Sequence, residues 1–142
     1  MNNEFIYISC KNKKFPYYSA KKLFEVYKNL ITENKLGFIG LIKRTKPFFY
    51  AVFVDGEFKG CLFVNMWDLE NKRCEIGGFS RRKSSKEVTQ GIKYFCRYIF
   101  SNFEINKIYV DTKHSHSAIA VIRAGFKRKG NILFMTRSNI NV

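Results

Sequence analysis

Residues that could carry chemistry are few in this sequence, and their spacing forms no familiar catalytic set. Glu75 lies in a run of strand-forming residues, Asp111 closes another such run, and His114 and His116 follow it. The two histidines suggest a metal, but the sequence offers no evident third ligand, and alternation along an extended chain would separate the rings. Asp111 is equally typical of a turn former, and Glu75 of a solvent-facing strand residue paired with a lysine.

The four cysteines indicate neither a zinc site nor a redox motif. Cys10, Cys61, Cys74 and Cys96 are scattered without any CxxC pair. Cys74 and Cys96 lie in apolar periodic stretches, so we expect them to be buried and reduced. The sequence also lacks a Gly-x-Ser-x-Gly motif, a Walker loop and a nucleophilic Cys/His context.

Charge is the strongest compositional feature. The chain has 142 residues and 26 Lys plus Arg against 11 Asp plus Glu, which gives a formal net charge of +15. Such an excess favours an anionic partner, which is a nucleic acid, a phosphate-bearing cofactor or an acidic protein surface. Basic residues cluster at 43–46, 81–83 and 127–129, and no acidic residue follows Asp111.

Length and hydropathy limit the organisation of the chain. A chain of 142 residues is one ordinary domain. No apolar run approaches the roughly 18 residues that span a bilayer, and the first four residues do not begin a secretory signal. We therefore expect no membrane association and a cytoplasmic location.

Hydrophobic periodicity predicts alternating strands and helices. The expected strands cover residues 4–11, 48–54, 57–64, 73–80, 105–111 and 131–137, with a further strand starting at Phe126 and a basic turn at 127–130. The expected helices begin at Ser19, at Ser84 or Ser85, and at Ser115 or Ser117. Residues 37–47 fit either a short helix or an exposed loop, and residues 67–72 fit a loop.

Two short motifs refine this order. Asp55-Gly56 predicts a type I′ hairpin, and Gly77-Gly78 predicts a bulge or a close backbone approach. The strand–helix–strand–helix order of the second half predicts a parallel pair of strands. The chain is therefore expected to form an α+β fold with a mixed, mainly antiparallel sheet flanked by helices.

This order and three local segments resemble the GNAT superfamily of N-acyltransferases. The segments are Cys74-Glu75-Ile76, the helix after the basic loop at 81–83, and SAIAVIRAGF at 117–126. Together they span about two-thirds of the chain, from Phe48 to Met135. The resemblance implies a single GNAT-like domain over residues 1–142, in which acetyl-CoA lies between two splayed strands.

The resemblance also implies which residues hold the cofactor. Its pyrophosphate would lie on the amides that open the helix after the basic loop, where the helix dipole favours anions. The implied residues are Phe79, Arg81, Arg82, Lys83, Ser84, Ser85, Lys86, Val88 and Ser117. Lys86 and Val88 stand where the family has glycine or a small residue. Lys86 would either replace amide contacts with a charge or block the cleft.

The catalytic positions match the family in part. Glu75 corresponds to a glutamate that acts as general base in some members, deprotonating the amine that attacks the thioester. The tyrosine that commonly serves as general acid is replaced by Val121. His114 stands in place of a common asparagine, and it could bind the cofactor arm or protonate the leaving thiolate.

Two main functions and one minor one follow. The first is transfer of an acetyl group from acetyl-CoA to a primary amine of a protein lysine or a small molecule. The second is a catalytically degenerate scaffold, similar to virion-associated or host-takeover proteins of bacteriophages, which docks through its basic surface. The third is direct binding of nucleic acid, which would be salt-sensitive and blind to sequence.

Overall fold

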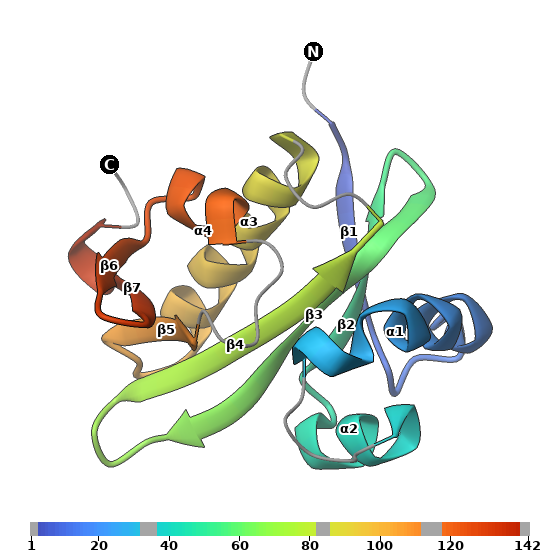
Figure 1. Cartoon of the computed structure of the whole chain (residues 1–142), viewed down its shortest axis with the longest axis horizontal. Coiled ribbons are helices and arrows are strands. Elements are labelled where there is room, and N and C mark those ends of the chain that lie inside the picture. Colours follow the sequence, from blue (N-terminus) through green and yellow to red (C-terminus); the bar gives the residue numbers. More distant parts are fainter. Residues whose placement is uncertain (1–2, 32–36, 82–85, 112–117, 140–142) are drawn as a thin grey trace.

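A computed structural model describes residues 3–31, 37–81, 86–111 and 118–139 (Figure 1). The strands are β1 (Phe5–Ser9), β2 (Phe49–Val54), β3 (Glu57–Asp68), β4 (Arg73–Ser80), β5 (Lys107–Asp111), β6 (Lys127–Lys129) and β7 (Ile132–Thr136). The helices are α1 (Tyr17–Ile31), α2 (Phe38–Thr45), α3 (Lys86–Asn102) and α4 (Ala118–Arg123), and a 3-10 turn covers Arg137–Asn139. The predicted α+β class is confirmed.

The described strands form one seven-stranded sheet in the order β1-β2-β3-β4-β5-β7-β6. All neighbouring strands are antiparallel except β4 and β5, which are parallel. The predicted parallel pair inside a mainly antiparallel sheet is therefore present. It arises because α3 carries the chain from the end of β4 back to the start of β5.

Helices cover both faces of the sheet (Figure 1). One core cluster lies on the side of α1 and α2 and contains Phe24, Leu41, Phe49 and Phe79. The other lies on the side of α3 and α4. The sequence predicts that this helix buries Val88, Ile92, Phe95, Cys96, Ile99, Phe100 and Phe103. In α3 five of these residues are buried together with Gly91, and Val88 and Phe103 pack against the same cluster as partly buried residues. The two faces of the central strands are consequently buried under different helices.

Three local expectations are corrected or decided. Residues 37–47 contain α2, because Phe38, Leu41 and Thr45 recur at helical spacing and are buried. Strand β3 extends to Asp68, so the expected loop at 67–72 is shorter, because Trp67 pairs with Cys74 and its ring packs on neighbouring aromatic rings. The expected basic turn at 127–130 is mostly strand β6, which pairs with β7, so the turn lies at Gly130 and Asn131.

The two glycine motifs, Asp55-Gly56 and Gly77-Gly78, have the backbone geometry that was expected of them. Asp55 and Gly56 both have positive φ, 51° and 83°, as a type I′ hairpin demands. At Gly78 an added Cβ would lie 2.6 Å from the carbonyl oxygen of Cys61, so the close backbone approach is confirmed. The bulge lies in the opposite strand, where the β3–β4 register shifts between Val64 and Met66.

Candidate functional site

The central feature of the site is a divergence of β4 from β5. The parallel ladder holds only three pairs, which end at Glu75 and Tyr109. Beyond them β4 runs on to Ser80 while β5 runs on to Asp111, still paired with Ile132 of β7. Among the described strands, none pairs with this edge of β4 after Glu75, so over Ile76 to Phe79 no described strand takes up its backbone donors and acceptors.

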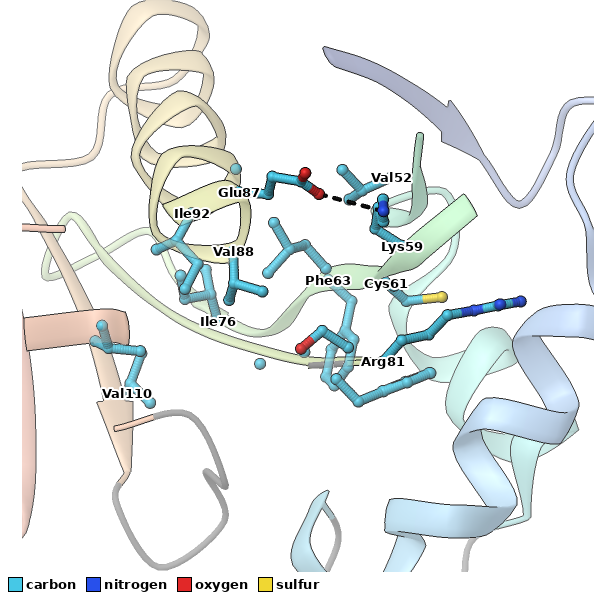
Figure 2. A pocket seen from close by; sticks show the side chains of 18 of the residues that line it. Val52, Lys59, Cys61, Phe63, Ile76, Arg81, Glu87, Val88, Ile92 and Val110 are labelled. Atoms are coloured by element: carbon cyan, nitrogen blue, oxygen red, sulfur yellow. Dashed lines mark ion pairs between the residues drawn. The ribbon is translucent and has the colours of Figure 1, made fainter. Parts of the chain in front are cut away.

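A cavity of about 450 Å³ occupies this divergence (Figure 2). Its lining residues come from β2, β3, β4, α3, α4 and the end of β5. The apolar part of its wall includes Ile76, Val88, Ile92, Val110 and Val121. Charged and polar side chains also line it, among them Lys59, Glu75 and Glu87. A cavity with apolar walls and convergent polar groups is the usual form of a small-molecule or cofactor site.

Glu75 lines the cavity at the point where the two strands separate. Its Oε2 accepts a hydrogen bond of 2.6 Å from Nδ2 of Asn65. Asn65 lies at the β3 bulge, and its Oδ1 accepts a hydrogen bond from the Arg44 guanidinium of α2. The Glu75 carboxylate is therefore held from one side by an amide whose orientation is itself fixed by a cation.

Tyr109 is the parallel neighbour of Glu75 on β5. Burial, followed by the charge of Glu75, raises the pKa of the Tyr109 phenol, and Arg73 opposes this shift. The Arg73 guanidinium carbon lies 5.9 Å from the centre of the Tyr109 ring. Tyr109 consequently stays protonated at neutral pH, beside the strand position that holds Glu75.

An ion-pair cluster lies at the other end of the cavity, beside the first turn of α3 (Figure 2). The Lys59 ammonium lies 3.5 Å from Oε2 of Glu87 and 3.6 Å from Oε2 of Glu57. All three side chains line the cavity. The beginning of α3 therefore carries a carboxylate that a lysine of β3 partly neutralises.

Comparison with known proteins shows the same architecture. The sequence matches no protein-family model and no curated protein. RimL, the ribosomal L7/L12 alpha-N-protein acetyltransferase in complex with coenzyme A, aligns with a TM-score of 0.68 and 13% identity over 93% of each chain. Aminoglycoside acetyltransferase AAC(6')-Ib in complex with coenzyme A aligns with a TM-score of 0.61 and 13% identity, over 99% of this chain and 98% of that one. The chain has the GNAT fold.

Other alignments are partial. A probable acetyltransferase aligns with a TM-score of 0.50 and 18% identity, covering 63% of this chain and 62% of that one. In a second AAC(6')-Ib structure, with ribostamycin and coenzyme A, this chain spans 65% of the length. At these identities the comparison establishes the GNAT fold alone.

The GNAT fold brings some of the implied residues to the cavity. Phe79, Arg81 and Val88 line it, as does Glu75. Lys86 is exposed at the start of α3 and is not among the lining residues, so the blocking of the cleft by this side chain is not observed. Six further candidates lie outside the described residues: Arg82, Lys83, Ser84, Ser85, His114 and Ser117. His116 lies outside them as well.

Sequence reasoning missed Arg44, Asn65, Lys59 and Glu87. Asn65 reaches Glu75 through a bulge that the sequence does not mark, and Arg44 reaches Asn65 from a different element. Of these four residues, only Glu87 has a position that the sequence marks. It is an acidic residue in the first turn of the helix whose start was expected to bind an anion, so it would compete with that anion.

The cysteines are packing residues in this fold. Cys61, Cys74 and Cys96 are buried free thiols, and burial raises the pKa of Cys74 to about 12. Burial also raises the pKa of Cys61 and of Cys96. Because the thiolate is the nucleophilic form, these three thiols are poor nucleophiles at neutral pH.

No helix within the described residues is both long and apolar enough to cross a bilayer.

Proposed function

We propose that this protein is an N-acetyltransferase that moves an acetyl group from acetyl-CoA to a primary amine. The observation that carries the proposal is the separation of β4 from β5 directly after Glu75, with a cavity in the gap. In this proposal, the bound thioester and the acceptor amine meet at the Glu75 carboxylate. The solved structures of RimL and AAC(6')-Ib with coenzyme A support the same proposal through their shared fold.

The cavity fits an extended, amide-containing cofactor arm. The edge of β4 that faces β5 has no described partner strand over Ile76 to Phe79, and its backbone donors and acceptors there can meet an extended arm as a further strand would. Val88, Val110 and Val121 provide apolar walls for its methylene and methyl groups. Lys59 and Arg81 provide positive charge at the end of the cavity where phosphate groups would lie.

Glu75 is the base in this proposal. When bound, acetyl-CoA supplies the thioester whose carbonyl carbon is attacked. Glu75 accepts the proton of the attacking amine, a new C–N bond forms as the C–S bond breaks, and the thiolate leaves. Since Asn65 occupies Oε2, the other carboxylate oxygen is the one that faces no described donor. His114 remains the candidate for protonating the thiolate, because Val121 has no proton to give.

Binding and transfer test the proposal in two steps. Calorimetric titration with acetyl-CoA should give saturable binding. Radiolabelled acetyl-CoA should then acetylate at least one member of an amine panel, which includes lysine peptides, peptides with a free N-terminus and aminoglycosides. Glu75→Gln should reduce transfer about a hundredfold, since general base catalysis contributes roughly that much or more. Glu70→Gln, in the exposed turn after β3, is the matched control. Absence of binding at millimolar acetyl-CoA would overturn the proposal.

A second candidate is a non-catalytic GNAT-fold scaffold of the kind found in bacteriophages. It is favoured by the strand β6, where Lys127, Arg128 and Lys129 are all exposed, and by Val121 in place of a tyrosine. Such a surface fits an acidic protein or, less specifically, a nucleic acid. Acetyl transfer to any lysate protein that Glu75→Gln abolishes would contradict this candidate. Nucleic-acid affinity that does not fall between about 50 and 200 mM salt would exclude the electrostatic nucleic-acid version.

A further inference from the structure

We propose that Lys59 binds the diphosphate of the cofactor and that Glu87 is the internal anion which this diphosphate displaces from it. The inference rests on the proposed function, because it names the residue that replaces the glycine-rich anion loop of the fold. That loop is altered in this chain, with Lys86 and Val88 at its small-residue positions. The cation that meets the phosphates then comes from a neighbouring strand.

Lys59 occupies the right place in the sheet. Its carbonyl oxygen accepts a 3.0 Å hydrogen bond from the backbone N–H of Arg81, so Lys59 lies beside the residue that follows β4. The register of the β2–β3 pairing shifts at Lys59, since Val52 pairs with Gly60 and Phe53 with Phe58, and the Lys59 ammonium reaches the Glu87 carboxylate of α3. Lys59 therefore projects toward α3, where it lines the cavity beside the first turn of that helix (Figure 2).

The charges around Lys59 are unbalanced. Its single ammonium faces two carboxylates, Glu87 at 3.5 Å and Glu57 at 3.6 Å. Glu87 also lies in the first turn of α3, where the helix dipole favours a negative charge. A diphosphate carries more negative charge and more acceptor oxygens than one carboxylate, so it can compete with Glu87 for both the lysine and the helix end.

The two other described cations near the start of α3 are less well placed. Arg81 also lines the cavity, but its guanidinium lies 5.5 Å from the centre of the Phe58 ring and points away from Glu87 (Figure 2). Lys86 is exposed and is not a lining residue. Among the described residues that line the cavity, Lys59 is thus the cation that shares a face of the sheet with the beginning of α3.

Two ligands that differ in their phosphates provide the test. Calorimetry measures affinity for acetyl-CoA, and NMR titration measures affinity for S-acetylpantetheine, which has the same arm without phosphates. Lys59→Gln should weaken acetyl-CoA binding about tenfold, because a charge-assisted hydrogen bond is lost. Its affinity for S-acetylpantetheine should not change. Lys59→Arg should retain most of the acetyl-CoA affinity.

Controls separate this effect from general charge and folding. Lys28→Gln removes the same charge from another lysine–glutamate pair, with Glu25 at 3.1 Å on α1, and should leave both affinities unchanged. Glu87→Gln should strengthen acetyl-CoA binding about threefold, since the competing carboxylate is removed. If Lys59→Gln does not fold, the other two variants still test the inference. Lys59→Arg should keep most of the acetyl-CoA affinity, and Glu87→Gln should increase it.

The outcomes separate this inference from the proposed function. Wild-type affinity of Lys59→Gln for acetyl-CoA, or weaker binding by Glu87→Gln, would overturn the role of Lys59 while leaving the acetyltransferase standing. Equal losses for acetyl-CoA and S-acetylpantetheine would also overturn it, because the effect would then not involve phosphate. Failure of the wild-type protein to bind acetyl-CoA would overturn both proposals.

Discussion

The side-chain amide of Asn65 donates a 2.6 Å hydrogen bond to Oε2 of Glu75. The bulge in β3 brings Asn65 to this position, and Arg44 of α2 binds its carbonyl oxygen. An amide oriented in this way can present only its N–H groups to the carboxylate. Glu75 is consequently restrained by residues from two elements other than its own.

Asn65→Ala should lower kcat for acetyl transfer about tenfold, because a restrained base would become mobile and lose one hydrogen-bond donor. The KM for acetyl-CoA should change little, since Asn65 restrains the base. Steady-state kinetics with a fixed amine acceptor measures both parameters. Asn71→Ala, in the exposed turn after β3, is the control. A raised KM for acetyl-CoA with unchanged kcat would show that Asn65 acts on binding instead.

Tyr109 reports the charge of Glu75 directly. The Glu75 carboxylate helps to raise the pKa of Tyr109, because it opposes the formation of a second negative charge. Glu75→Gln should therefore lower the pKa of Tyr109, although burial, the larger cause, keeps it above the ordinary value. Ultraviolet difference titration of Glu75→Gln with and without Tyr109→Phe isolates this phenol. An unchanged titration would mean that the two groups do not interact.

Tyr7 makes stability depend on alkaline pH. Burial raises the pKa of Tyr7, and its hydroxyl donates a 2.5 Å hydrogen bond to the carbonyl oxygen of Gly91 in α3. A group with a raised folded pKa contributes stability that is full below the unfolded pKa of about 10 and is lost as pH rises above it.

Tyr7→Phe should therefore cost about 1 kcal/mol of unfolding free energy at pH 7. The same substitution should make the unfolding free energy fall less steeply above about pH 10. Part of this pH dependence remains in Tyr7→Phe, because burial also raises the pKa of Tyr50. Urea unfolding at a series of pH values measures both effects. Tyr18→Phe, at an exposed position of α1, should leave both unchanged. An equal slope in wild type and Tyr7→Phe would refute the linkage.

Gly78→Ala should destabilise the fold by about 1–3 kcal/mol, since overpacking against a fixed neighbour has such a cost. The added Cβ would lie 2.6 Å from the carbonyl oxygen of Cys61, and a backbone atom in a central strand cannot easily move away. Gly37→Ala is the matched control, because its Cβ would meet nothing within 4 Å. Thermal unfolding compares the two variants, and equal melting temperatures would argue against the close approach of β3 and β4.

Local patterns in the sequence predicted much of the fold. The apolar spacing of α3, the Asp55-Gly56 hairpin and the strand that contains Glu75 are all present as expected. Local patterns gave wrong predictions for segments whose structure depends on pairing with another strand. Trp67 and Lys127–Lys129 look like loop residues, yet each pairs with a neighbouring strand. Strand pairing joins distant segments, so a short window of sequence carries little information about it.

The sequence by itself determined most of the elements, their order and the strongly basic composition, and the order together with three local segments indicated the GNAT fold. Only the tertiary structure decided that β4 leaves β5 after Glu75, that Asn65 reaches Glu75, and that Lys59 lies beside Glu87. Each of these relations depends on register, on a bulge or on where a strand end meets a helix. A net charge of +15 predicts an anionic partner, but the positions of two carboxylates around one lysine decide how such a partner would bind.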